Sequence, residues 1–399
     1  MKNKKNNIFN WKPDRSSFPE MGQDGKPIID LDSQKFIKVW QGPNHPGITG
    51  NMALELTISG DEVVESKTHV GYLHRGFEKL FERRRYIQCF PTCIRMCVPE
   101  PDTNEYNLAR GTEELAGIEV PEMANWLRML VLELARLQVL LRMVPGQAGT
   151  MGLGLGSQWG MYYREQILDR MEELTGGRIY HMYIIPGGVR GMLPDGFKQR
   201  LEENLVSIEG FLKDIDKLIY SNAVFKKRTI GIGHIPNDWV DHYGIVGPVA
   251  RAAGFERDVR KDYPYLYYDQ LDFDYNTAQD SDVFSRFIVR RKDLETTLDL
   301  LRQIMAKMPD QGDIRAETPN VLHWKVPKGE TYVRCESSRG EYGFYMVADG
   351  SAYPRRINLR GPSYTHAISV LEKLLVNANI SDVSSILVSL ATCPPEIER

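Results

Sequence analysis

Residues 121–143, PEMANWLRMLVLELARLQVLLRM, carry the clearest helical pattern in the chain. Pro121 stands where the first turn of a helix tolerates proline, and leucines then recur every three or four residues. These leucines are Leu127, Leu130, Leu134, Leu137 and Leu141. The spacing predicts a helix that is buried over a broad face. Four charged residues make it too polar to cross a bilayer, because each is expensive at the bilayer centre: Arg128, Glu133, Arg136 and Arg142.

Three further segments predict helices that pack around this one. The first, 161–177, closes on a glycine pair at Gly176, the residue type that most often ends a helix. The other two, 195–219 and 281–308, have the same apolar periodicity. The middle of the chain is therefore predicted to be a helix bundle.

Strand-like sequence occurs near both ends of the chain. Residues 36–65 alternate apolar and polar side chains around Gly and Pro turns, which favours a small antiparallel sheet. Segments 329–350 and 354–361 alternate in the same way, and a last helix is predicted over 363–378. The predicted fold class is α+β. Its expected organisation is a polar arm over 1–35, a small β region over 36–70, a helical core over 71–326 and a C-terminal α/β segment over 327–399.

Composition excludes several classes of function. The 399 residues include 53 acidic and 50 basic ones, so no basic field exists to hold nucleic acid. The basic start, MKNKKNNIFN, is not followed by the apolar run of a secretory signal, and we expect a cytoplasmic protein. Five cysteines, an odd number, argue against a disulfide framework and leave metal binding, reactivity or burial as their roles.

Three features admit a plain structural interpretation. Cys89, Cys93 and Cys97 are spaced almost as in radical enzymes that use S-adenosylmethionine, but we favour Cys89 and Cys93 as two small buried side chains. The glycines of residues 149–160 resemble a nucleotide loop, yet no βαβ unit surrounds them, and we expect close helix packing instead. His45, in a loop between prolines, is a candidate proton donor, with a turn-capping role as the alternative.

Two of the five cysteines open the same four-residue frame. Residues 97–100 read CVPE, and residues 393–396 read CPPE. Around these frames runs an ordered series of motifs that covers nearly the whole chain from Phe36: GPNHPG, THVGYLHRGFEKL, IPGGVRGMLP, ESSRGEYGFYMVADG, INLRGPS and a final EIER. The series resembles the catalytic large subunit shared by respiratory complex I, where it is the 49-kDa subunit, and the membrane-bound nickel–iron hydrogenases. The resemblance implies that fold, and a place on the cytoplasmic face of a membrane complex.

The resemblance also gives the two frames a meaning. In the hydrogenases, nickel and iron are held by two CxxC motifs, one near each end of the chain. By this comparison Cys97 and Cys393 keep the first thiolate of each pair, and Glu100 and Glu396 stand where the second would be. A carboxylate is a harder ligand than a thiolate. We therefore expect the fold to bring the frames together without a metal centre and without hydrogenase activity.

The quinone site of complex I is also expected to be absent. At the places of its histidine, tyrosine and acidic residue, this chain has Thr49, Val98 and Thr150. The branch of the family with neither site is that of the ferredoxin-dependent sulfane sulfur reductases. That resemblance implies electron flow from ferredoxin to a 4Fe-4S cluster of an adjacent small iron–sulfur subunit, and ion translocation. The other expected partners are a 30-kDa-like subunit, a ferredoxin-like cluster subunit, a membrane anchor and antiporter-like subunits.

Reduction of an S–S bond in that cavity needs a sulfur nucleophile and protons. Cys97 or Cys393 can exchange with a polysulfide. Glu100 and Glu396, as two neighbouring carboxylates, are expected to share a proton and act with His45 as donors. No cofactor is expected to be bound by this chain alone.

The resemblance places three further residues near the partner's cluster, namely Arg75, Arg95 and His181. For Arg75 the alternative is a salt bridge with Glu78. Two other functions stay open: reduction of a quinone or another acceptor, and a non-catalytic scaffold.

Overall fold

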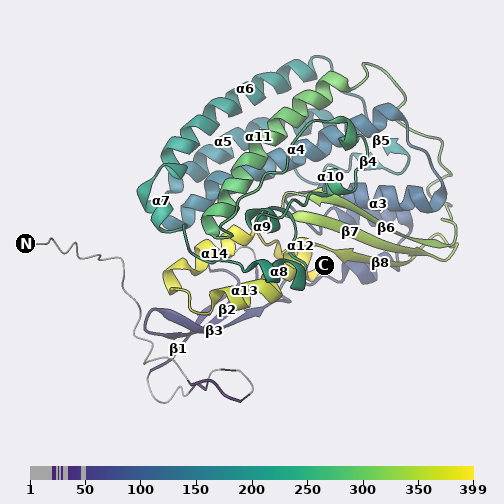
Figure 1. Cartoon of the computed structure of the whole chain (residues 1–399). Helices are drawn as coiled ribbons and strands as arrows, with labels where there is room; N and C mark the ends of the chain where they lie inside the picture. The colour runs from purple at the N-terminus through teal and green to yellow at the C-terminus, as the bar shows by residue number, and fades with distance from the viewer. Residues whose placement is uncertain (1–19, 24–25, 27, 30–34, 46–50) are drawn as a thin grey trace, which may run out of the picture.

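The computed structural model describes residues 20–23, 26, 28–29, 35–45 and 51–399 (Figure 1). Most of the predicted polar arm over 1–35 lies outside these residues. The segments predicted as helices around residues 121–143 are helical in the structure. They form α5 (Gly154–Thr175), α6 (Phe197–Ile215) and α11 (Val283–Lys307), which pack with α4 (Glu122–Gly146) as a bundle of long helices (Figure 1). The predicted helical centre and α+β class are confirmed.

The helices of the bundle begin and end at residues that commonly cap helices. The Asp282 side chain accepts a hydrogen bond from the backbone N–H of Ser285 at 2.7 Å and caps α11. Gly176, at φ 83°, ends α5 where the sequence predicts. The same helix begins seven residues before the predicted start of residue 161, and it includes Gly154, Gly156 and Gly160.

Those glycines serve close packing, as expected. A Cβ atom added to Gly160 would overlap the ring of Pro145 and the carbonyl oxygen of Leu141, both on α4. The absence of a side chain therefore lets α5 lie against α4. The residues between the bundle helices form short helices, turns and a two-stranded antiparallel sheet of β4 (Ile184–Ile185) and β5 (Gly188–Val189). Within the described residues no helix is long and apolar enough to span a bilayer.

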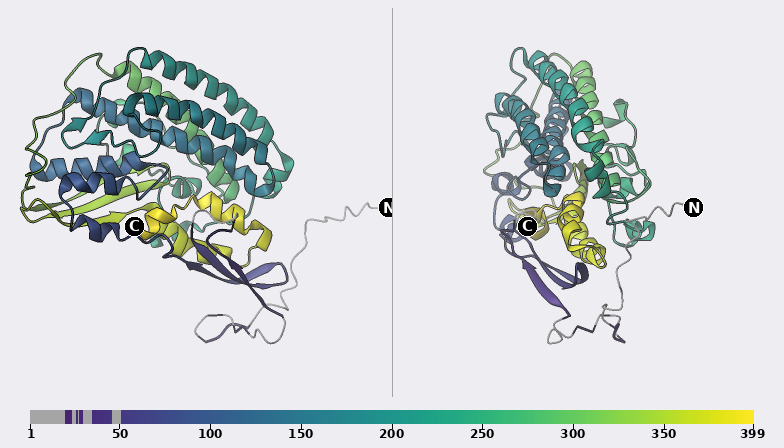
Figure 2. Two further views of the ribbon diagram at one scale, coloured as in Figure 1. Left: turned by 180° about the vertical axis from the view of Figure 1, so that it is seen from behind. Right: turned by 90° about the vertical axis from the view of Figure 1, so that its left-hand side faces the viewer.

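Two three-stranded antiparallel sheets lie outside the bundle, one formed from the N-terminal and one from the C-terminal part of the chain (Figure 1). The first has the order β1 (Ile37–Gln41), β2 (Ala53–Ser59), β3 (Glu62–His69), and the second has the order β6 (Gly329–Ser337), β7 (Gly340–Ala348), β8 (Pro354–Arg360). In Figures 1 and 2 the C-terminal elements lie between the N-terminal sheet and the helix bundle. They are α12 (Pro362–Tyr364), α13 (Leu371–Leu375), α14 (Val383–Leu390) and α15 (Pro394–Glu398).

This arrangement brings distant parts of the sequence to one place. α1 (Phe77–Phe81) and α2 (Tyr86–Cys93) lead to the turn that holds the first frame, and α3 (Pro101–Ala116) leaves it and packs on β6 and β7. The second frame lies at the start of α15, which contacts α12. The two frames, residues 97–100 and 393–396, therefore meet between the helices and the second sheet.

Candidate active site

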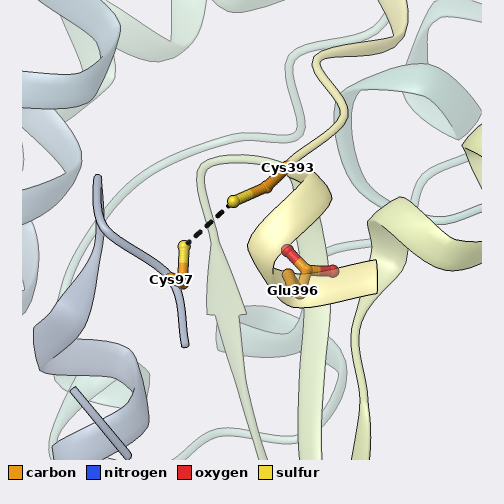
Figure 3. A group of neighbouring side chains, drawn as sticks. All are labelled: Cys97, Cys393 and Glu396. Atoms are coloured by element: carbon orange, nitrogen blue, oxygen red, sulfur yellow. Dashed lines mark hydrogen bonds between the residues drawn. The ribbon is translucent and has the colours of Figure 1, made fainter. Parts of the chain in front are cut away.

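The sulfur atoms of Cys97 and Cys393 lie 3.8 Å apart (Figure 3). Cys97 is in the turn between α2 and α3, and Cys393 directly precedes α15. Both side chains are buried. The fold therefore brings the CVPE and CPPE frames side by side, as the resemblance implies, although 296 residues separate them.

A buried arginine that the sequence reasoning missed completes the pair. Arg339, in the turn between β6 and β7, is only 5% exposed. Its Nη1 donates to the Cys97 sulfur at 3.6 Å and to Glu100 Oε2 at 2.9 Å. The residue lies within the ESSRG motif that carried the resemblance, but no local signal points a turn arginine toward a cysteine 242 residues away.

The two thiols titrate as a pair. The hydrogen bond between the two thiols and burial raise the pKa of Cys97, whereas the same hydrogen bond lowers the pKa of Cys393 against the effect of burial. The Arg339 charge favours the thiolate form of both. One proton therefore leaves readily, and the second is held between the sulfurs.

Glu100 and Glu396 each accept two hydrogen bonds from one serine. The backbone N–H and the hydroxyl of Ser338 donate to Glu100, at 2.8 and 2.6 Å. Ser363 does the same for Glu396, at 2.9 Å in both bonds, and its hydroxyl also accepts from the backbone N–H of Cys393 at 3.1 Å. Among the described residues no hydrogen bond joins the two carboxylates, so the expected sharing of a proton between them has no direct contact to support it.

Burial nevertheless suits Glu396 to proton handling. Its pKa is raised by burial, which outweighs the opposing effects of Arg339 and Ser363. One of its oxygens lies within 4.8 Å of both sulfurs. Sulfur and carboxylate oxygen are also atoms that can ligate a metal. The expectation that the chain holds no metal therefore stays a prediction.

Gly361 makes room for the second carboxylate, and its replacement is a direct test of this packing. A Cβ atom added there would overlap the Glu396 carboxylate. We expect Gly361→Ala to lower the free energy of unfolding by about 1–3 kcal/mol, the usual cost of overpacking. Urea unfolding measures it. Gly210→Ala is the matched control, because this exposed position on α6 has nothing within 4 Å of an added Cβ and should gain up to about 1 kcal/mol. Equal stability of the two variants would contradict the packing.

A cavity of about 540 Å³ opens beside the sulfur pair. Cys393 and Arg339 line it, whereas Cys97 is not among its lining residues. Val98, His181, Arg142 and Arg164 also line it. The cavity therefore presents one thiol, several cations and one imidazole to a bound molecule.

His181 faces this cavity from a buried position. Its Nδ1 lies 2.9 and 3.0 Å from the two carboxylate oxygens of Asp102, on α3, and its Nε2 is buried without a hydrogen-bond partner among the described residues. Burial lowers the pKa of His181, but the Asp102 charge and hydrogen bond outweigh it and the net direction is upward. The sequence did not single out Asp102 as a site residue, although it stands two residues after the CVPE frame.

Arg75 and Arg95 lie together on the surface. Arg75 Nη2 donates to the backbone carbonyl of Arg95 at 2.7 Å, and the Arg95 guanidinium lies 5.1 Å from the ring of Tyr180. The alternative salt bridge of Arg75 with Glu78 does not form. Glu78 instead pairs with Arg356 at 2.7 Å and with Arg399 at 2.8 Å.

The remaining candidates lie apart from the cavity lining. His45 is exposed in the loop after β1, and its backbone N–H donates to the Gly42 carbonyl at 3.0 Å. Its predicted proton-donor role stays a prediction. Cys89 and Cys93 are fully buried, as predicted for small apolar side chains. Thr49 lies outside the described residues, and the hydroxyl of Thr150 donates to the carbonyl of Gln147 at 2.9 Å.

Comparison with known proteins gives one consistent family. Residues 151–324 and 318–399 match the family described as the 49-kDa subunit of respiratory-chain NADH dehydrogenase. The chain is 42% identical to an NADH-quinone oxidoreductase subunit of Thermosipho melanesiensis, over 91% of this chain and 99% of the relative. It is 35% identical to an F(420)H(2) dehydrogenase subunit of Methanosarcina mazei, over 92% and 99%.

Among solved structures, it matches a chain of the membrane-bound sulfane sulfur reductase, an archaeal respiratory membrane complex. The TM-score is 0.90 and the identity 38%, over 93% of this chain and all of that one. Fold, motifs and relatives agree. The chain belongs to the family of the 49-kDa subunit of the respiratory-chain NADH dehydrogenase.

Proposed function

We propose that this chain forms the catalytic cavity in which a respiratory complex reduces sulfane sulfur with electrons from ferredoxin. As a member of its family it is an oxidoreductase subunit of a complex I-related respiratory complex. One observation carries the proposal: two cysteine sulfurs lie 3.8 Å apart beside a buried arginine, and one of them lines a cavity. A thiolate attacks S–S bonds directly, so this pair suits a polysulfide substrate.

The cationic lining supports an anionic sulfur chain as substrate. Arg142, Arg164 and Arg339 line the cavity together with the Cys393 thiol. The Cys97–Cys393 pair holds a proton, and His181, lining the same cavity, can hold another. The residues present can therefore bind the anion, attack it and supply protons to the sulfide that leaves.

Reduction of a quinone is the second candidate, because a relative 42% identical over most of the chain carries that activity in its name. The side chain of Val98, which lines the cavity, has no group that can donate a hydrogen bond to a quinone carbonyl. Thr150 is not among the lining residues, and its hydroxyl donates to the backbone carbonyl of Gln147. These two positions favour sulfur chemistry over quinone chemistry.

The electrons in this proposal come from a partner protein. We assign the 4Fe-4S cluster to a neighbouring small iron–sulfur subunit, since this chain has no cluster motif of its own. Arg75 and Arg95 fit a surface beside an anionic cluster, because both are exposed and neither guanidinium is paired with a carboxylate in the described residues. When bound, the cluster would supply electrons to the cavity.

The rest of the complex is proposed from the same resemblance. It comprises a 30-kDa-like subunit, a ferredoxin-like cluster subunit, a membrane anchor and antiporter-like subunits that translocate ions. In this arrangement the chain lies at the cytoplasmic face of the membrane and is held there by its partners.

The test is a product analysis on the intact purified complex. With reduced ferredoxin and polysulfide, we expect sulfide release without hydrogen. Cys393→Ser should lower sulfide release at least about tenfold, because it removes the thiol that attacks the substrate. Glu396→Gln should lower it too, because it removes a carboxylate that can carry a proton beside the two sulfurs. Cys335→Ser, a buried cysteine on β6, is the matched control and should keep the wild-type rate.

Three other outcomes would each overturn the proposal in a different way. Hydrogen evolution would mean that the two frames hold a hydrogenase metal centre. Quinone reduction without sulfide would favour the second candidate. Full sulfide release by both Cys393→Ser and Glu396→Gln would leave the chain as a scaffold.

A further inference from the structure

Cys97 and Cys393 differ in their access to the cavity. Holding a substrate would not by itself require this difference. Cys393 lines the cavity, whereas Cys97 lies behind it at 3.8 Å and contacts Arg339. A polysulfide that enters the cavity therefore meets Cys393 first. Cys97 is placed to reach whatever forms on the Cys393 sulfur.

We propose that Cys393 and Cys97 form a thiol–disulfide couple, in which Cys393 takes a sulfane sulfur from the substrate and Cys97 expels it as sulfide. This inference rests on the proposed function and specifies how its chemistry proceeds. It makes Cys393 the attacking residue and Cys97 the resolving one. Neither residue alone completes the reaction.

The first step transfers one sulfur atom. The Cys393 thiolate attacks the terminal sulfur of a polysulfide dianion, a bond forms between the two sulfurs, and the S–S bond behind the attacked atom breaks. The shortened polysulfide leaves with its two negative charges, and Cys393 becomes a persulfide. Arg339, buried beside both cysteines, stabilises the charge at this place.

The second step closes the disulfide. The Cys97 sulfur attacks the Cys393 sulfur, the persulfide S–S bond breaks, and the outer sulfur leaves as hydrosulfide with the proton that Cys97 gives up. The two cysteines lose two electrons and the sulfane sulfur gains them. Glu396 has an oxygen within 4.8 Å of both sulfurs and can carry that proton. Two electrons from reduced ferredoxin and one proton then restore the Cys97 thiol and the Cys393 thiolate.

The geometry permits this bond without a large rearrangement. Disulfide sulfurs lie about 2.0 Å apart, so the two atoms must approach by roughly 1.8 Å. Cys97 belongs to a turn, and its movement breaks no helix. The other described cysteines have no such neighbour: Cys89 and Cys93 donate to backbone carbonyls, and Cys335 lies on β6.

The experiment traps the couple in the intact complex. The cysteines of the complex are reduced with a thiol reagent that leaves the partner's cluster oxidised, and the reagent is removed without air. The complex is then mixed with polysulfide in the absence of ferredoxin, quenched with iodoacetamide under denaturing conditions and digested with trypsin. The cysteines separate cleanly, because Cys97 lies in peptide 96–110, Cys393 in 374–399, Cys335 in 335–339 and the remaining two in 86–95. We expect a cross-link between peptides 96–110 and 374–399, with about one sulfide released per complex.

Variants assign the two roles. Cys97→Ser should stop at the first step, so that peptide 374–399 gains one sulfur atom and no sulfide is released. Cys393→Ser should give neither product. Cys335→Ser should cross-link like the wild type. Peptide 86–95 should be alkylated in every protein, and peptide 335–339 in every protein that keeps Cys335. An added sulfur on peptide 96–110 in the Cys393→Ser protein would overturn the order of attack.

The wild-type measurement decides the proposal even if a variant fails to assemble. Full alkylation of both Cys97 and Cys393 after exposure to polysulfide would overturn the couple. If the same complex still releases sulfide with reduced ferredoxin, the proposed function stands without the couple. If it releases none, the proposed function fails as well.

Discussion

Replacement of Arg339 by leucine is expected to lower the free energy of unfolding by about 3–5 kcal/mol, the usual cost of leaving a buried charge without its partner. The Arg339 side chain is 6% exposed and that of its partner Glu100 only 1%. Their atoms are 2.9 Å apart. Without the guanidinium, Glu100 would keep only the two hydrogen bonds from Ser338, and the buried Cys97–Cys393 pair would lose the cation beside it.

Urea unfolding of the purified chain measures this loss against a surface pair. Arg302→Leu is the matched control, because Arg302 pairs with Glu202 and Glu209 at a site where the side chains are 31–43% exposed. Exposed pairs contribute about 0–1 kcal/mol. Arg339→Lys should fall between the two, since it keeps the charge but not the reach to both partners. A loss for Arg339→Leu no larger than for Arg302→Leu would disprove the role of this pair.

The sequence predicts the helices and strands, whose apolar residues recur at a regular spacing. It does not predict the side-chain contacts between residues that are far apart in the chain. The bundle helices follow from apolar spacing, and both sheets follow from alternation. The meeting of the frames came from the resemblance, since no local rule joins residues 97 and 393. Arg339, Ser338 and Ser363 lie in turns or at a helix start, where sequence preferences describe the backbone and not the partner of a side chain.

The end of the chain shows the same limit in its secondary structure. One helix was predicted over 363–378. The structure instead has α12, a π-helical segment (Thr365–Val370) and α13, which ends at Leu375. π-Helical turns often occur at functional or strained places, and apolar spacing does not predict them. This segment carries His366, which the sequence reasoning did not single out.

His366 is fully buried, and neither ring nitrogen makes a hydrogen bond of good geometry among the described residues, although the Leu390 backbone lies near enough to raise its pKa slightly against the larger effects of burial and charge. Burial, followed by the charges of Arg290, Arg360 and Arg286, lowers its pKa to about 3. In the unfolded chain a histidine titrates near 6.5. The unfolded state therefore binds a proton at a higher pH than the folded state does. The resulting stability is complete above about pH 6.5 and is lost as the pH falls toward 3.

From these two pKa values, lowering the pH from 7 to 4 should cost about 3 kcal/mol through His366 alone. Urea unfolding of wild type and His366→Leu across that range isolates this contribution, because other groups titrate in both proteins. The variant should lose about 3 kcal/mol less than the wild type over the same pH change, whatever its stability at pH 7. His242→Leu, at an exposed position on α8 (Asn237–His242), should keep the wild-type slope. Equal acid sensitivity of wild type and His366→Leu would mean that His366 gains its proton without unfolding, which requires an acceptor or water at its ring nitrogens.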